Sequence, residues 1–537
     1  MIIKSYSLRS GFNTGRVPES VFRATLLVFL FLFCVTFASH AQTVNPLTAP
    51  VVKIEDLDGD GFTDAAVETS LLRVIFSSRN GSPSVLYLKG RSFEENIYPP
   101  AIQEMGYKLP PESLKPFTGN LKGMQEPAGF NIELEEQAVD RVVIRATANI
   151  SLLAAEKSEA ESLTLVKRYT IFTNSYHFNI EYLVTNLKDQ LVAVGDELSG
   201  ALSLTYGPGL FMDPFGPASL IGLKPGAVEA FSDVTKLNAA GAVAGAFNGI
   251  GLRDQYFCVL LESDSQIRIN ASVFEVTSED PKRSAQSGKV ITCLLPSFNL
   301  GARESRTFNF KIYAGPMLLD HLSRINRDHV SEYGFLSTIL LRVLQFFYGL
   351  LPNYGLAIIL LTIVVRLVLY PLTLKQTKSM AQMQKIQPMV QDLKDRYKDN
   401  PQKFNEEVLR LYQKNNVNPL GGCLPLLLQL PILIALYNTI RIAVELRKTP
   451  FLWISDLSKG DPLLILPIAI AALMYYQQGK MSTDPQQQQM MAFMPMFMFV
   501  ITWSLPAGLL VYWFASSVLG LIQQLQANRM SAALKEE

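Results

Sequence analysis

The sequence predicts an α-helical polytopic membrane protein that carries a large exported all-β domain. Apolar tracts occur near residue 24 and again in a series from about residue 336 onward. Between them, residues 42–330 have the composition of a water-soluble domain and alternate apolar and polar residues as strands do. A lysine- and arginine-rich segment inside the second series marks the cytoplasmic side. A net charge of +1 says nothing about a nucleic-acid partner, and no basic domain stands out.

Residues 1–41 predict a cytoplasmic N-terminus and a signal-anchor helix. Four basic residues precede the apolar run at 24–38. The run is short for a span, and Ser39 and Ala41 offer the small residues of a cleavage site. A signal anchor and a signal peptide cleaved after Ala41 both stay open, and either one exports the domain that begins at residue 42.

Residues 42–330 predict a single large β-sandwich. Runs rich in β-branched and aromatic residues occur at 71–76, 142–146, 163–169 and 178–184, separated by turn clusters such as Arg79–Pro83. Many short strands with few helical stretches are typical of sandwiches.

An acidic loop near the start of this domain leaves two interpretations open. Asp56, Asp58, Asp60 and Asp64 resemble the first half of an EF-hand loop, but the twelfth position is Val67 instead of glutamate. The loop is either a shortened calcium site or a solvated acidic turn.

The residues that could carry enzyme chemistry form no recognisable constellation. The four cysteines and four histidines show no metal-ligand spacing, and there is no phosphate-binding loop and no HExxH motif. We therefore expect no catalytic residue, no cofactor and no metal. Cys258 and Cys293 either form a disulfide in the oxidising compartment or stay buried as free thiols.

The C-terminal part predicts an interfacial helix and then a five-span core at 353–527. Residues 331–352 contain the interfacial amphipathic helix, with Arg342 and Gln345 on its wet face, although an extra span is the alternative. The predicted spans are 356–374, 424–442, 463–477, 490–505 and 508–525.

A charged segment at 375–417 separates the first two spans and predicts a cytoplasmic helical hairpin. Asn400 and Pro401 form a helix start, and Pro388 should kink or restart the helix before it. Counting spans from a cytoplasmic N-terminus also places this hairpin inside, so charge and parity agree. Residues 528–537 form a short cytoplasmic tail.

Arg366 is the most informative residue of the core, because a full charge near a span centre costs about 2.5–3.5 kcal/mol on insertion scales. It either binds something or snorkels to the interface. Thr362 lies one turn before it, and Gln429, Tyr512 and Ser516 lie in other spans. Singly these polar residues fit interhelical hydrogen bonds, and together with Arg366 they predict a hydrated cavity.

The motifs of residues 330–527 resemble the YidC–Oxa family of membrane-protein insertases, in order and in spacing. The stretches that carry the resemblance are Tyr354-Gly355 with Ile363–Arg366 and Tyr370–Thr373, Asn418–Cys423 with Gln429–Ile432, Phe451–Leu457 with Asp461-Pro462, and Phe493–Pro495 with Pro506–Leu509 and Tyr512-Trp513. The exported domain, which ends in Phe310–Pro316, resembles the Gram-negative bacterial YidC branch. This resemblance implies a β-supersandwich like that of galactose mutarotase, and a five-helix insertase core whose groove is open to the cytoplasm and the lipid.

The resemblance also implies a function, a location and partners. The function is insertion and chaperoning of hydrophobic segments of nascent proteins in the bacterial inner membrane, with a substrate groove formed by Arg366, Thr362, Gln429 and Tyr512. The implied partners are nascent membrane proteins, the ribosome, the Sec translocon with its accessory subunits and the lipid bilayer, without direct nucleic-acid recognition. Both termini would be cytoplasmic and residues 42–352 periplasmic. The alternative is a small-molecule anion transporter that uses Arg366, although no internal repeat supports it. A mutarotase-like enzyme would need an acid–base pair that the exported domain lacks.

Overall fold

The computed structural model describes residues 49–536 apart from 58, 60, 90–93, 99–116, 123, 125–126, 128, 152–161, 198–199, 208–218, 277–285, 399, 416–423 and 479–484. The predictions for residues 1–41 lie outside the described part. The chain divides into two compact units. The described residues of Thr43–Glu332, with Ile442–Arg447, form the β unit, and those of Tyr333–Arg441 and Lys448–Glu537 form the helical unit.

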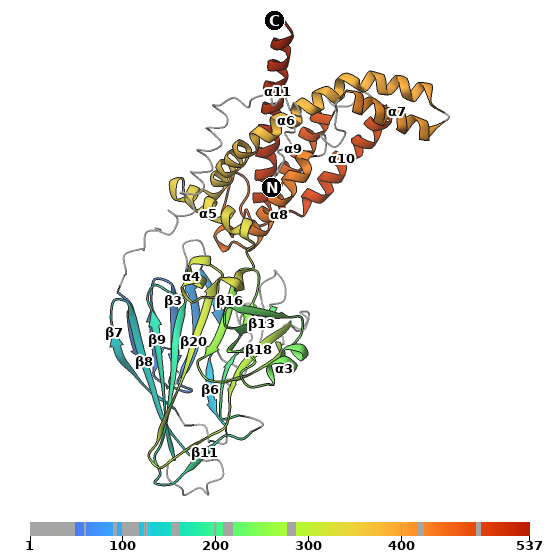
Figure 1. Cartoon of the computed structure of the whole chain (residues 1–537). Helices are drawn as coiled ribbons and strands as arrows, with labels where there is room; N and C mark the ends of the chain where they lie inside the picture. Colours follow the sequence, from blue (N-terminus) through green and yellow to red (C-terminus); the bar gives the residue numbers. More distant parts are fainter. Residues whose placement is uncertain are drawn as a thin grey trace, which may run out of the picture. The chain divides into compact units, whose positions relative to one another are not determined.

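Antiparallel strands build the β unit (Figure 1), which confirms the predicted all-β architecture. Its largest described sheet has the order β14-β13-β15-β16-β20-β10-β9-β8-β7. The strands of this sheet are β7 (Asn131–Gln137), β8 (Arg141–Ile150), β9 (Leu163–Phe172), β10 (His177–Asn186), β13 (Ser219–Lys224), β14 (Ala227–Phe231), β15 (Gly249–Arg253), β16 (Phe257–Ser263) and β20 (Ser305–Pro316).

Three smaller sheets complete the described strands, in the orders β1-β2-β3-β4-β5, β17-β18-β12-β6 and β11-β19. Their strands are β1 (Val51–Glu55), β2 (Asp64–Glu68), β3 (Leu72–Ser77), β4 (Ser82–Lys89), β5 (Glu94–Tyr98), β6 (Thr118–Leu121), β11 (Val192–Val194), β12 (Leu202–Tyr206), β17 (Arg268–Val276), β18 (Gln286–Leu295) and β19 (Phe298–Leu300). Two short α-helices, α3 (Val234–Gly241) and α4 (Leu319–Arg324), and the 3-10 helix η4 (Asp328–Ser331) also belong to this unit.

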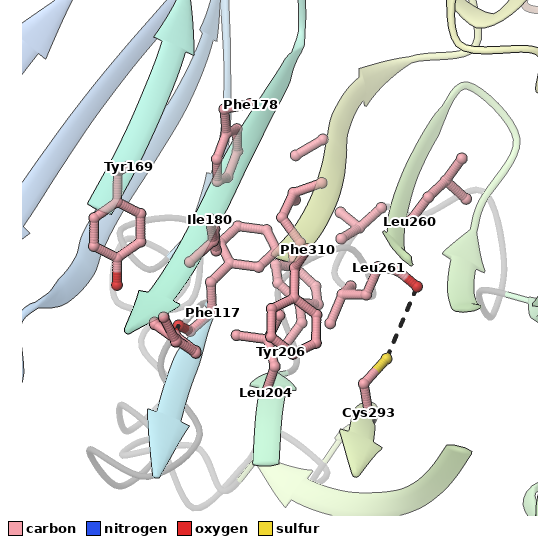
Figure 2. Packing of buried hydrophobic residues seen from close by; sticks show 14 of the residues in the cluster. Phe117, Tyr169, Phe178, Ile180, Leu204, Tyr206, Leu260, Leu261, Cys293 and Phe310 are labelled. Atoms are coloured by element: carbon pink, nitrogen blue, oxygen red, sulfur yellow. Dashed lines mark hydrogen bonds between the residues drawn. The ribbon is translucent and has the colours of Figure 1, made fainter. Parts of the chain in front are cut away.

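One hydrophobic core joins the sheets. Alternate residues of β10 are fully buried, as its period of two predicts. Phe117, which precedes β6, packs its ring 5.2 Å from that of Phe178 on β10 and 5.3 Å from that of Tyr206 on β12. Figure 2 shows these rings together with Phe310 of β20, so the β6–β12 sheet packs on the large sheet as the second layer of a sandwich.

Cys258 and Cys293 lie in this core as buried free thiols, the second of the two alternatives. The Sγ of Cys293 donates to the carbonyl of Leu261 at 3.8 Å (Figure 2). Burial raises the pKa of both thiols far above the usual value, so neither forms a reactive thiolate.

The acidic loop before β2 is organised by its own backbone. Both carboxylate oxygens of Asp56 accept amide hydrogens, from Gly59 at 2.8 Å and Gly61 at 3.0 Å. Both glycines have positive φ, which favours residues without a Cβ. Asp58 and Asp60 lie outside the described residues, and the described part holds no group of three metal-binding side chains. The acidic turn thus has a structural explanation, and the calcium alternative stays untested.

The segment Ile442–Arg447, which comes after α8 in the chain, packs within the β unit. Val444 belongs to the hydrophobic core of that unit, and Leu446 is also fully buried. The Arg447 guanidinium lies 5.3 Å from the ring centre of Tyr256 and 5.5 Å from that of Phe257. These cation–π contacts hold the segment against the start of β16.

Each predicted span overlaps an α-helix of the helical unit. Its α-helices are α5 (Phe335–Leu350), α6 (Tyr354–Arg396), α7 (Pro401–Lys414), α8 (Leu424–Ile442), α9 (Ile465–Gln478), α10 (Pro485–Trp503) and α11 (Ala507–Glu536). Within the described residues, Tyr354–Thr373 and Ala507–Gln524 are long and apolar enough to cross a membrane by themselves, and α5, α9 and part of α10 are shorter apolar helices.

Helix α6 is longer than the sequence predicts. It continues without a break from Tyr354 to Arg396 and contains both Pro371 and Pro388, so of the two alternatives predicted for Pro388, a kink or a restart, the restart is wrong. The first predicted span and the first helix of the hairpin are therefore one element. Asn400 begins α7 as predicted, because its side chain accepts from the amide of Lys403. Figure 1 shows α7 folded back beside the distal end of α6.

Helix α5 is attached to α8 by hydrogen bonds. The Ser337 hydroxyl donates to the Ala435 carbonyl at 3.0 Å, and the Thr439 hydroxyl donates to the carbonyls of Ser337 and Ala435. Arg342 and Gln345 are half-buried instead of lying on an exposed face. Polar contacts with α8 as well as amphipathicity thus position α5.

Candidate functional site: the polar cluster around Arg366

Arg366 is the only charged residue of α6 between Tyr354 and Leu374. Its side chain is half-buried. The Nε donates to the hydroxyl of Ser516 on α11 at 2.9 Å, and no ion pair with Arg366 occurs among the described residues. The charge is therefore held by a neutral partner, with its terminal nitrogens left available.

Helix α11 presents its polar residues to this charge as one stripe. Tyr512, Ser516 and Gly520 recur every four residues and so share a face. Tyr512 and Ser516 are buried, and Gly520 has no Cβ where the guanidinium lies. A Cβ built at Gly520 would lie 3.2 Å from both Nη1 and Nη2 of Arg366.

Helix α8 adds a second polar contact to the stripe. The Gln429 amide donates to the Tyr512 hydroxyl at 2.5 Å, across 83 positions of sequence. Arg366, Ser516, Tyr512 and Gln429 thus form one polar cluster contributed by three helices. In an apolar surrounding such a cluster can hold water or the polar groups of a passing chain.

Thr362 lies one turn before Arg366 but has its hydrogen-bonding donor already occupied. It is fully buried, and its hydroxyl donates to the Ile358 carbonyl of its own helix at 2.7 Å. Such back-bonding is common for threonine inside apolar helices. Thr362 therefore enters the cluster as packing beneath Arg366.

The loop that precedes α9 packs against the starts of α6 and α11. The ring of Phe451 packs where Gly355 has no side chain, since a Cβ there would come within 2.0 Å of the ring. The amide of Gly508 donates to the Leu457 carbonyl at 2.8 Å, and that of Ala507 to the Lys459 carbonyl at 2.6 Å. These bonds fix the loop to the first turn of α11.

Asp461 gives the same loop its internal order. Its Oδ1 accepts from the Trp453 indole at 3.0 Å, and its Oδ2 accepts from the Leu466 amide in the first turn of α9 at 2.7 Å. The motifs around Phe451, Asp461 and Gly508 thus build one packed and hydrogen-bonded loop, which we name the plug.

Sequence reasoning identified Arg366, Gln429, Tyr512 and Ser516, but not Gly520. The available signal was the spacing of four residues that continues from Tyr512 through Ser516. A glycine inside a helix normally indicates only a cost in helix propensity, so its role as space for a charge was not evident.

Comparisons with known proteins match both units. Residues 346–534 match the family described as 60Kd inner membrane protein, and residues 147–345 match the YidC periplasmic domain. The membrane protein insertase YidC of Tolumonas auensis is 36% identical over 390 residues, which are 68% of this chain and 69% of that protein. That of Hahella chejuensis is 32% identical over 509 residues, or 91% of this chain and 82% of that protein.

A solved structure of an active YidC insertase, with its first transmembrane domain resolved, covers 94% of this chain and 98% of its own at 19% identity, with a TM-score of 0.38. The relatives confirm the predicted fold class, a helical membrane core with a periplasmic domain made largely of β-sheet. They favour the insertase prediction over the anion transporter. On these grounds the chain belongs to the YidC family of membrane protein insertases, proteins of the inner membrane.

Proposed function

We propose that this chain moves hydrophobic segments of nascent proteins into the bacterial inner membrane through the polar cluster around Arg366, alone or beside the Sec translocon. The observation that supports the proposal most is the state of Arg366. A half-buried guanidinium without a carboxylate partner, among the described residues, is costly in an apolar setting. A ligand that brings a carboxylate would remove that cost.

The physical logic of the proposal is a lower barrier. A substrate's polar tail must cross a medium in which each unpaired amide or charge is expensive. A cluster of donors and acceptors reaching partway across shortens that path. The apolar segment of the substrate then leaves sideways into lipid, and its burial there drives the process. No covalent bond is made or broken, so the proposed function needs no catalytic residue.

The plug around Phe451 and Asp461 supports an orientation for the site. In the proposed topology both termini are cytoplasmic and residues 42–352 are periplasmic, so the plug lies at the periplasmic side. A groove closed by the plug and open toward the hairpin of α6 and α7 would admit substrate from the cytoplasm. Thr362 would pack one helical turn before Arg366 on α6, while Gln429 and Tyr512 contact the substrate.

Site-specific crosslinking during translation tests the proposal. A photoreactive residue at Gln429, inside the cluster, should crosslink to a nascent single-span protein. The matched control is the same probe at Ile468, which lies on α9 and is 56% exposed. Strong crosslinks from 468 and none from 429 would mean that substrates meet the outside of the bundle, and would contradict the proposal.

Ribosome contact is a further part of the proposal. With few basic residues in the tail, the charged hairpin is the better candidate. Neutralising Lys394, Arg396 and Lys398 should weaken co-sedimentation with ribosomes, whereas removing residues 528–537 should change it little. Lys398 pairs with Asp395 at 3.1 Å on an exposed surface, and such a pair contributes little to stability. The reverse ranking would place the contact in the tail.

A further inference from the structure

The guanidinium of Arg366 is held by one nitrogen out of three. Its Nε is engaged by Ser516, and no hydrogen bond from Nη1 or Nη2 occurs among the described residues. The two terminal nitrogens lie against Gly520, one helical turn beyond Ser516. The guanidinium is planar, so a bond at Nε leaves Nη1 and Nη2 side by side at its far end. In this geometry the two Nη groups can donate to both oxygens of one carboxylate.

We propose that Ser516 and Gly520 are positioning residues that present the Arg366 fork to a carboxylate of the translocating substrate. Ser516 fixes the orientation of the guanidinium, and Gly520 supplies the space in which it lies. This inference rests on the proposed function and adds the two residues that orient the guanidinium for that ligand.

The glycine is required by distance. A Cβ at position 520 would lie 3.2 Å from Nη1 and Nη2 and 3.4 Å from Cζ, closer than ordinary van der Waals contact. Alanine would displace the guanidinium by a few tenths of an ångström, whereas a branched or longer side chain would take its place. Glycine is also the weakest helix former after proline. Alanine at 520 should therefore raise helix propensity and at the same time disturb the fork, so stability and activity move in opposite directions.

The sharpest variant places a competing carboxylate inside the cluster. In Gly520→Asp the new side chain lies beside both Nη groups and can occupy them, and in Gly520→Asn an amide of nearly the same size replaces it without the charge. Comparing these two variants separates the effect of a carboxylate bound to the Arg366 Nη groups from the effect of a larger side chain at position 520. Ser516→Ala removes the acceptor of Nε, with Ser516→Thr as the conservative rescue. Ser517→Ala is the control on the same helix, because the interhelical hydrogen bond of Ser517 within the described part of the chain is at its backbone carbonyl, which accepts from the Gln477 amide at 3.3 Å.

The assay reconstitutes the full chain in liposomes and measures insertion of one single-span substrate with an acidic, a neutral or a basic tail. In Gly520→Asp, insertion of the substrate with an acidic tail should fall at least about tenfold relative to insertion of the substrate with a neutral tail. This is the scale of one charge-assisted hydrogen bond. In Gly520→Asn and Ser516→Ala the ratio of acidic-tail to neutral-tail insertion should fall by only about threefold, because the guanidinium keeps its charge and loses only part of its fixed orientation. Ser516→Thr, which keeps the hydroxyl, should recover most of the loss seen in Ser516→Ala. Ser517→Ala should match wild type, and thermal melts of all variants should show a folded helical unit.

Equal losses for all three tails in Gly520→Asp would show a structural role only and overturn the inference, as would wild-type insertion of acidic tails. Insertion that depends on the anionic lipid content of the liposomes and not on the tail would assign the fork to a lipid phosphate, which also overturns it. Arg366→Ala distinguishes failure of the positioning role from failure of the proposed function. If Arg366→Ala loses acidic tails and Gly520→Asp does not, only the positioning role fails. If Arg366→Ala changes nothing, the proposed function fails as well.

Discussion

Two arginines, one in each unit, show how differently the two parts of the molecule treat a charge removed from water. Arg327 of the β unit makes two hydrogen bonds of 2.7 Å to the carboxylate of Glu262, and its remaining nitrogen donates to the Lys224 carbonyl at 2.6 Å. Arg366 of the helical unit has one neutral partner, Ser516, and no ion pair within the described residues.

The two arginines differ in the role that we assign to each charge, structural for Arg327 and substrate-binding for Arg366. A fully paired guanidinium is a closed structural element, because both the charge and its donors are satisfied. Lys167 in the β unit is satisfied in a different way, by several neutral groups. Its buried ammonium donates to the Asn80 carbonyl at 2.7 Å and lies 4.5 Å from the Phe130 ring centre. An unpaired guanidinium reduces stability and keeps its binding capacity. In the proposed function, the paired charge of Arg327 serves folding and the charge of Arg366 serves ligand binding.

The largest effect is expected from breaking the ion pair between Arg327 and Glu262. Arg327→Met leaves the Glu262 carboxylate buried without its partner and should destabilise the β unit by about 3–5 kcal/mol. Hydrogen exchange at β16 and β20 in the full chain measures this, because exchange resolves the stability of each unit. Arg303→Met, which removes an exposed pair with Asp189, is the control and should change the exchange rates little. A loss below about 1 kcal/mol in Arg327→Met would show that the pair does not hold the β unit together.

A second charge effect in the β unit depends on pH. Burial, with the nearby charge of Arg324, lowers the pKa of His321 on α4 from 6.5 to about 4. Asp320 and His177 also face the ring, and Tyr176 packs edge-on against it at 5.0 Å. The folded state holds His321 neutral while the unfolded chain takes up a proton below its ordinary pKa. Stability is therefore fully present above pH 6.5 and is lost as the pH falls toward 4.

The loss over that range should reach at most about 3 kcal/mol. His321→Phe keeps a ring against Tyr176 and cannot be protonated, so it should flatten the dependence of hydrogen-exchange protection on pH. His329→Phe alters an exposed histidine of the same region and should keep the wild-type slope. An unchanged slope in His321→Phe would assign the acid sensitivity to other groups.

Replacing Arg366 should have the opposite effect on stability to replacing Arg327. Arg366→Met should leave the stability of the helical unit unchanged or raise it, because an unpaired charge is removed from an apolar setting. Insertion of acidic tails should fall by about tenfold to a hundredfold, the scale of hydrogen bonds to charged groups. Arg366→Lys keeps the charge without the fork and should give an intermediate result.

Insertion assays with acidic, neutral and basic tails, combined with thermal melts, check this expectation. Loss of stability together with loss of all three substrates would make Arg366 a second structural arginine, and the contrast between the two units would disappear. Unchanged insertion in every case would return Arg366 to snorkelling at the interface.

Composition and periodicity predicted most of the fold, because both are local properties. The boundaries of α8, for example, come directly from the apolar run at 424–442, and the alternation in β10 comes from its period of two. The continuity of α6 was missed for an identifiable reason. Proline disfavours a helix interior, yet the helix passes both Pro371 and Pro388, so context outweighs the local preference there.

The site was predictable in its residue types and not in its contacts. Arg366 and Ser516 are 150 positions apart, and only the packing of α6 on α11 brings them together. Thr362 shares a face with Arg366 as its spacing predicts, but its hydroxyl bonds within its own helix, a choice that the sequence does not reveal. Gly520 matters through the absence of a side chain, which a sequence pattern cannot show.

The smallest expected effect tests whether the two units are functionally separate. Every residue of the polar cluster lies in the helical unit, so deleting residues 60–300 should leave insertion close to wild type. The structure adds one requirement, because the segment Ile442–Arg447 buries Val444 and Leu446 within the β unit and would become exposed. The deletion should therefore be made with and without Val444→Ser and Leu446→Ser. Both forms should insert substrate, and the substituted form should aggregate less in detergent. If both forms are well expressed and neither inserts substrate, the β unit contributes to insertion itself. The assignment of structural charges to the β unit and of substrate binding to the helical unit would then be wrong.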